Sequence, residues 1–195
     1  VPILVRSAES LYSRFDDKVG CIRSWNKREG KDWDYIVIID NMMNLELLMR
    51  ASDLTGDKKF ARAAGLHADK TIKNHFRPDG SCCHVVSYDS GSGKSGGQFT
   101  AQGLADGSSW SRGQGWAVYG FSSMYKWTAE RRYLKQAEKS AGFIIGHPNT
   151  PEDGIVYWDY DAEAGENTPR DASASAVIAS AFLELSTQTK NPDLK

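Results

Sequence analysis

The sequence predicts an all-α fold in which helical hairpins stack into a closed α/α ring. Three observations predict it: a turn that recurs along the chain, apolar residues at helical spacing after that turn, and long irregular loops between the hairpins. An open solenoid is the other arrangement that such a repeat allows. We favour the ring because loops this long are usually functional, and a ring gathers them at one mouth.

The recurring turn follows helix-like segments and places Thr55, Thr128 and Thr189 in register. Five positions after each threonine stands a large apolar residue: Phe60, Tyr133 and Leu194. Residues 60–76 and 133–147 then carry apolar side chains at helical spacing. Both segments stop near a proline, and an Asp-Gly turn and a short strand-like run follow each of them.

The repeating unit is therefore a helical hairpin of roughly 60 to 75 residues, and about three hairpins are present. The N-terminus fits as a partial copy, with a helix end over residues 8–15 followed by a strand-like run over 19–25. A ring of six hairpins would need about twice this length. We expect residues 1–195 to be part of a single α/α-barrel catalytic domain, truncated at both ends.

Composition excludes some classes of function. The chain is 40% hydrophobic and 25% charged, an ordinary soluble balance, and its net charge of −1 argues against a nucleic-acid binder. No apolar run approaches the roughly 20 residues that span a bilayer, so no membrane partner is expected. No signal peptide is visible at the start, but a missing start could hide one, so the compartment stays open between bacterial cytoplasm and periplasm. Cys21, Cys82 and Cys83 are expected as buried thiols, without zinc-ligand spacing.

Asp40 follows five largely apolar residues, 35–39, and precedes a helix-like segment. One interpretation is a helix N-cap, in which the carboxylate accepts backbone N–H groups. The other is a partly buried general acid, whose pKa burial would raise so that it donates a proton near neutral pH. Position alone favours the N-cap.

Residues 107–116 combine three glycines, two tryptophans, an arginine and a glutamine. Arg112 can bind a carboxylate through two parallel hydrogen bonds, and Trp116 can stack on a sugar ring. The alternative is a tight loop that enters a helix over 116–127 and packs its aromatic rings. The density of polar and aromatic groups favours a site.

Other candidates are individually weak. His84 and Trp25 occupy corresponding strand-like runs, although each alone would more often be a core residue. Gln102 lies in a polar loop. Residues 90–97 resemble a phosphate loop but lack its first glycine and its preceding strand, so we interpret them as a flexible loop. Asp171 is expected to cap a helix of small residues, and a role in the site is the weaker interpretation.

Three motifs together resemble the unsaturated glucuronyl hydrolases, glycoside hydrolase family 88: residues 40–44 (DNMMN), 111–116 (SRGQGW) and 170–174 (RDASA). The resemblance implies an (α/α)6 barrel, about half of it present. It also implies hydrolysis by hydration of the C4=C5 vinyl ether in a terminal unsaturated uronic acid. By residue match, Asp40 resembles the acid/base. The residues that resemble substrate-binding groups are Trp25, His84, Gln102, Arg112 and Trp116.

The resemblance implies an unsaturated uronate-containing oligosaccharide as the ligand, and no metal or organic cofactor. The family's second Asp has no counterpart in residues 1–39. Three alternatives stay open: an unsaturated rhamnogalacturonyl hydrolase, an inactive glycan-binding fragment, and a helical repeat scaffold that binds proteins. The last predicts candidate residues that are scattered instead of convergent.

Overall fold

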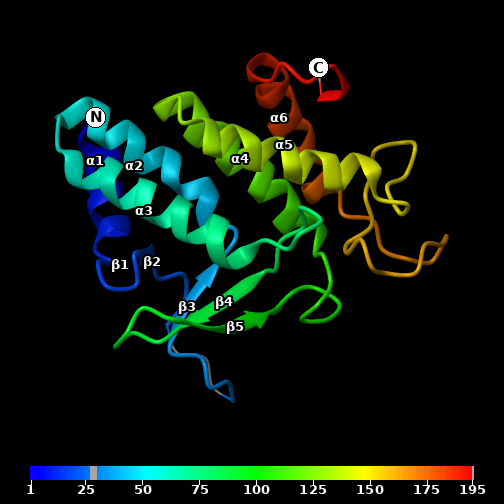
Figure 1. The fold of residues 1–195 in the computed structure, drawn as a ribbon, viewed down its shortest axis with the longest axis horizontal. Coiled ribbons are helices and arrows are strands. Elements are labelled where there is room, and N and C mark those ends of the chain that lie inside the picture. Colours follow the sequence, from blue (N-terminus) through cyan, green and yellow to red (C-terminus); the bar gives the residue numbers. More distant parts are fainter. Residues whose placement is uncertain (27–29, 195) are drawn as a thin grey trace.

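The computed structural model describes residues 1–26 and 30–194 and is mostly helical (Figure 1). Its helices are α1 (Pro2–Tyr12), α2 (Asn41–Thr55), α3 (Lys58–His75), α4 (Ser111–Thr128), α5 (Arg131–Gly146) and α6 (Ala172–Gln188). Two small antiparallel sheets accompany them: β1 (Phe15–Asp16) with β2 (Cys21–Ile22), and β3 (Tyr35–Ile38), β4 (Val85–Tyr88) and β5 (Ser95–Phe99) in that order. A 3-10 turn, η1 (Pro192–Leu194), follows α6.

Helices α2, α4 and α6 form an inner layer, in which α4 packs against both of the others. Arg112 and Asp171 pair at the starts of α4 and α6, and near the helix ends Gln188 donates to the backbone oxygen of Ser122. The two helices therefore run parallel. Helices α3 and α5 pack on the outside, against α2 and α4 (Figure 1). This is the layering of an α/α barrel, so the predicted fold class is confirmed.

Gly120 is where α4 approaches α2 most closely. A Cβ added there would lie 2.4 Å from the Met42 Cβ and 2.8 Å from its carbonyl carbon, and Met42 is fully buried. We expect Gly120→Ala to lower the free energy of unfolding by about 1–3 kcal/mol, because one helix must move. Urea unfolding measures the change.

The matched control is Gly142→Ala in α5, where nothing lies within 4 Å of the added Cβ. It should stabilise the chain by about 0.5–1 kcal/mol, through helix propensity alone. Equal effects of the two substitutions would contradict the close packing of α2 on α4 at Gly120.

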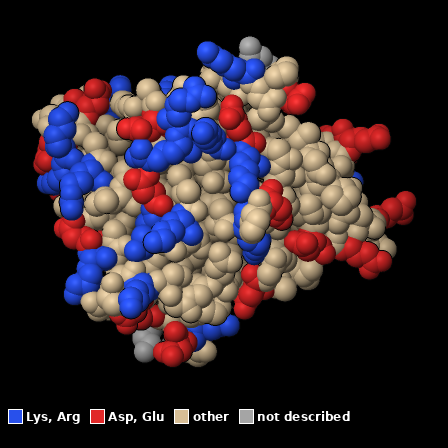
Figure 2. All heavy atoms as spheres, viewed as in Figure 1, with Lys and Arg blue, Asp and Glu red and all other residues tan. Residues whose placement is uncertain are grey.

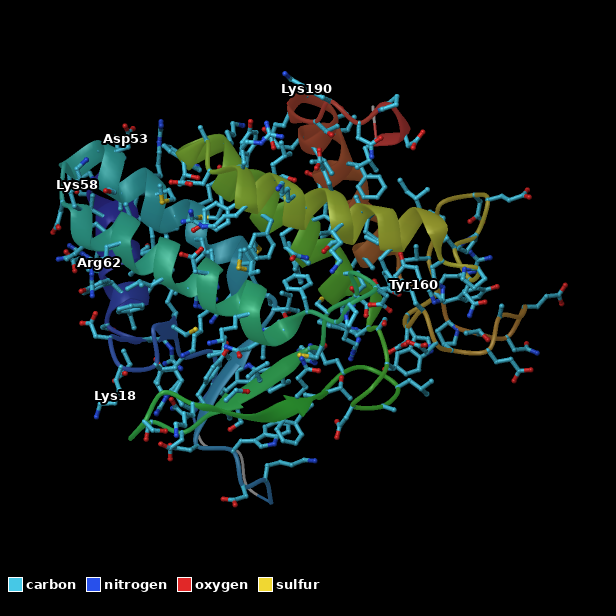
Figure 3. All side chains as sticks on the ribbon, viewed as in Figure 1. Lys18, Asp53, Lys58, Arg62, Tyr160 and Lys190 are labelled. Atoms are coloured by element: carbon cyan, nitrogen blue, oxygen red, sulfur yellow. The ribbon has the colours of Figure 1, made fainter. Side chains whose placement is uncertain are left out.

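The recurring threonine has the same role in all three copies. Its Oγ1 accepts the backbone N–H two residues further on, from Asp57 (3.2 Å), Glu130 (3.2 Å) and Asn191 (3.0 Å). Each of these turns comes at the end of an inner helix, α2, α4 or α6, and Figure 3 labels Asp53, Lys58 and Lys190 beside the first and third turns. The hairpin turns therefore lie at the ends of the inner helices opposite to their starts.

The small sheet brings distant segments to those helix starts. β3 ends two residues before Asp40, and β4 begins one residue after His84. The backbone N–H of Ile39 donates to the His84 oxygen at 3.0 Å, which places the two junctions together. One face of the sheet buries Cys21 and Cys83 with Tyr35, Val37, Val86 and Tyr88. All three cysteines are buried free thiols, as predicted.

Two local predictions are wrong, and so is the helix start in the alternative interpretation of residues 107–116. Helix α4 begins at Ser111 instead of residue 116, and Gly113 and Gly115 lie in its first turns, close to neighbouring side chains. Residues 95–97 lie in β5, paired with β4, instead of a flexible loop. Residues 155–158 form no strand and pair only through an isolated bridge of Tyr157 with Arg170.

Cationic side chains lie mainly over the helices, and acidic ones mark the loops at the right of Figure 2. Several of the cations are paired between helices, among them Arg132 of α5 with Asp69 of α3 at 2.7 Å. Such pairs neutralise part of the basic outer face. Over the described residues, no helix has both the length and the apolarity to cross a bilayer.

Candidate active site

Asp40 lies at the junction between β3 and α2, at the N-cap position of α2. Its side chain makes no capping hydrogen bond, because the residue has helical backbone angles, φ −56° and ψ −28°. The capping interpretation is therefore wrong for the side chain. Only 24% of that side chain is exposed, and burial raises the pKa of the carboxyl from 3.8 to about 6, against the opposing charge of Arg112.

His84 faces Asp40 from the segment that leads into β4. The distance from its Nε2 to Oδ2 of Asp40 is 3.7 Å. Its Nδ1 accepts the backbone N–H groups of Ala101 (3.1 Å) and Gln102 (3.3 Å). A neutral ring whose Nδ1 accepts carries its proton on Nε2, so that N–H is directed at the Asp40 carboxyl.

Two tryptophans flank the His84 ring. Trp25 meets it edge-on, with ring centroids 5.8 Å apart, and Trp110 lies at 4.5 Å on a tilted plane. Trp110 was not among the predicted site residues. The concentration of polar and aromatic side chains in residues 107–116 was the available signal. It could not show which of the two tryptophans lies beside His84.

Arg112 projects from the first turn of α4. Its Nη1 lies 2.7 Å from Oδ2 of Asp171, and its Nη2 lies 3.5 Å from Oε1 of Gln102. Its guanidinium also covers the Trp110 ring at 4.8 Å. Asp171 caps α6 as predicted, accepting the Ala174 N–H at 2.8 Å, and the ion pair with Arg112 is a second contact that the sequence did not reveal.

The loop that carries Gln102 is anchored by Asp159, which is fully buried. One carboxylate oxygen of Asp159 accepts the Leu104 N–H (2.9 Å) and the Ser108 hydroxyl (2.7 Å). The other accepts the N–H of Asp161 at 3.0 Å. Gln114, from the same motif as Arg112, has a structural role, because its side-chain amide bonds both the N–H and the oxygen of Cys82.

Contacts therefore link five of the six predicted residues: Trp25, Asp40, His84, Gln102 and Arg112. Trp116 is half-buried one turn further along α4, where its ring meets Tyr119 edge-on at 6.2 Å. This convergence argues against a scaffold with scattered polar residues. Within residues 1–26 and 30–194, no cluster of His, Cys, Asp or Glu has the arrangement of a metal site.

A layer of parallel inner helices, with a buried carboxyl, an arginine and aromatic rings at its mouth, defines the class: an α/α barrel of the kind found in carbohydrate-active enzymes. No family model matches the chain. The chain is 45% identical over 189 residues, 97% of its length, to the unsaturated glucuronyl hydrolase of Formosa agariphila, of which it covers 47%. It is 32% identical to the unsaturated chondroitin disaccharide hydrolase of Streptococcus agalactiae, over 93% of the chain and 45% of that protein.

A crystal structure of an unsaturated glucuronyl hydrolase specific for heparin matches with a TM-score of 0.92 and 48% identity, over 96% of this chain and 50% of that one. The chain is thus related to the unsaturated glucuronyl hydrolases, and the resemblance seen in its motifs is confirmed. It spans about half the length of the curated relatives it matches.

Proposed function

We propose that residues 1–195 form part of the catalytic domain of a hydrolase that removes a terminal unsaturated uronic acid from lyase-generated oligosaccharides. One observation carries the proposal: Asp40 is a largely buried carboxyl with a pKa of about 6, at the mouth of the inner helices and within the field of Arg112. Such a carboxyl can donate a proton near neutral pH and can accept one in the same cycle.

In the proposed reaction, protonated Asp40 gives its proton to C4 of the C4=C5 vinyl ether. The oxygen of one water bonds to C5, and the proton that this water loses returns to Asp40. The C5 hemiketal then opens: the bond between C5 and the ring oxygen breaks, C5 becomes a ketone, and the hemiketal proton passes to the ring oxygen. The hemiacetal left at C1 collapses to an aldehyde, and its proton goes to the glycosidic oxygen, which leaves as a hydroxyl of the remaining oligosaccharide. One water is consumed, and Asp40 ends the cycle protonated, as it began.

The other candidate residues supply binding. Arg112 suits the uronate carboxylate, because a guanidinium binds a carboxylate through two parallel hydrogen bonds. Trp25 and Trp116 offer ring faces for stacking, while His84 and Gln102 offer polar contacts. Relatives named for heparin and for chondroitin disaccharides support an acidic, glycosaminoglycan-derived substrate for this chain as well.

The test uses unsaturated disaccharides from chondroitin, heparin, hyaluronan and rhamnogalacturonan, each paired with its saturated counterpart. We expect the absorbance of the double bond to disappear with at least one glycosaminoglycan product, and we expect no cleavage of any saturated disaccharide by mass spectrometry. The saturated controls are decisive because hydration requires the double bond, whereas attack at the anomeric carbon does not.

Each other outcome identifies a different function. Consumption of the rhamnogalacturonan product alone would replace the proposal with a rhamnogalacturonyl hydrolase. Binding without turnover, seen by saturation-transfer NMR, would leave an inactive glycan-binding chain. Neither binding nor turnover with any member of the panel would refute the proposed function.

A further inference from the structure

We propose that Asp171 is a positioning residue: it fixes the guanidinium of Arg112 and offsets its charge, so that Arg112 can bind the substrate carboxylate while Asp40 keeps its proton. The inference rests on the proposed function for its substrate, although its geometric part stands without one. Asp171 lies at the N-cap of α6 and Asp40 at the N-cap position of α2, so the proposal links the two flanking inner helices through Arg112 of α4.

The carboxylate of Asp171 is itself held in place. Its Oδ1 accepts the Ala174 N–H at 2.8 Å, while its backbone N–H donates to the Val156 oxygen at 2.8 Å. Its side chain is only 11% exposed. Oδ2 is therefore presented to Arg112 from a rigid helix start, at 2.7 Å from Nη1. A partly buried, charge-assisted contact of this length is stronger than an exposed ion pair.

This arrangement orients Arg112 without using all its donors. A guanidinium has five N–H groups. Nη1 of Arg112 donates to Asp171, and Nη2 lies at a longer distance, 3.5 Å, from the side-chain oxygen of Gln102. Trp110 supports the plane of the group at 4.8 Å. The remaining donors stay available on a side chain that is 30% exposed. Pre-orientation reduces the conformational entropy lost when a carboxylate binds.

Arg112 of this pair also acts on the Asp40 carboxyl, whose pKa it lowers. Besides its own backbone N–H, which lowers the pKa, three side chains bear on its carboxyl: His84 and Cys82 from the segment before β4, and Arg112 from α4. Burial raises the pKa of the Cys82 thiol, so it stays neutral, and the hydrogen bonds of His84 suit a neutral ring. Arg112 is therefore the fixed charge, and it favours the ionised form of Asp40. Asp171 counteracts that effect because it lies against the same guanidinium.

The test is Asp171→Asn in the whole 195-residue chain. Asparagine is a good N-cap and keeps an oxygen for the Ala174 N–H, so it removes the charge and leaves the cap. We expect the Asp40 carboxyl, titrated by NMR, to ionise at lower pH than in the parent chain. With an unsaturated disaccharide, KM should rise about tenfold with a smaller change in kcat. The alkaline limb of the rate profile should also shift to lower pH.

The matched control is Asp57→Asn, which alters the same kind of cap on α3, where the Asp57 side chain accepts the Lys59 N–H at 3.0 Å. It should leave both the Asp40 titration and KM unchanged. An Asp40 titration that does not move in Asp171→Asn overturns the inference, whether or not the chain is active. If the parent chain neither binds nor converts any disaccharide while that titration still moves, the proposed function fails and the charge-offsetting role of Asp171 survives.

Discussion

Asp40→Asn is expected to reduce turnover of unsaturated disaccharide by about 10² to 10⁴-fold, the range for loss of a general acid–base group. The amide keeps the size of the carboxyl but can neither deliver a proton to C4 nor take one from water. Initial rates measured by loss of the double-bond absorbance test this directly. An Asn variant as fast as the parent would show that another group transfers the proton.

The same substitution should stabilise the chain, because burial makes the Asp40 anion costly. Its pKa in the folded state is about 6, above the ordinary 3.8, so the folded chain holds this proton more tightly than the unfolded chain. The Asn variant should therefore exceed the parent in free energy of unfolding most above pH 6, and not at all below about pH 4. A shift of about two pH units corresponds to a gain on the order of 3 kcal/mol.

Urea unfolding of parent and variant at pH 8 and pH 4 measures that difference. Asp53→Asn is the control on the same helix, since the Asp53 side chain is 57% exposed beside Arg50 near the far end of α2. It should alter neither rate nor stability appreciably. If Asp40→Asn lost both turnover and stability, the role of Asp40 would be structural instead. Replacing a carboxyl that is kept for catalysis at a cost in stability should raise the free energy of unfolding.

The helical hairpins were predictable because their signals are local. The threonine turns depend on a hydrogen bond to a residue only two positions away, and the apolar spacing after each turn decides which face is buried. The capping role of Asp171 was predictable for the same reason. Each of these features depends on residues within one or two helical turns.

The site was only partly predictable, because its contacts join residues far apart in the chain. The Arg112–Asp171 pair spans 59 positions, and no local pattern at either residue reveals it. The glycines near Arg112 suggested a loop because glycine is unfavourable inside helices. Gly115 nevertheless lies within α4, where an added Cβ would be 3.1 Å from both Val177 and Ile178. Tertiary packing overrode propensity there.

Asp159→Ala is expected to be the most destabilising single substitution near the site, costing about 2–4 kcal/mol. Its carboxylate is fully buried and accepts from Leu104, Ser108 and Asp161, so alanine removes the acceptor of two backbone N–H groups. The Ser108 hydroxyl keeps its second acceptor, the Ala105 oxygen at 2.8 Å. Leu104 and Asp161 are exposed residues, and water reaching their amides limits the loss. Urea unfolding measures the stability, and hydrogen exchange over residues 100–110 should show where protection is lost.

Asp161→Ala is the matched control in the same loop. Asp161 is exposed, and its side chain accepts one backbone N–H, from Ser109 at 2.7 Å, so its loss should cost less than about 1 kcal/mol. Asp159 fixes the loop in which the Gln102 N–H donates to His84. Asp159→Ala should therefore also have a higher KM than the parent. Similar losses of stability in the two variants would mean that water replaces the Asp159 carboxylate. The loop would then be held by its backbone contacts, such as the Tyr160 N–H to the Ser109 oxygen.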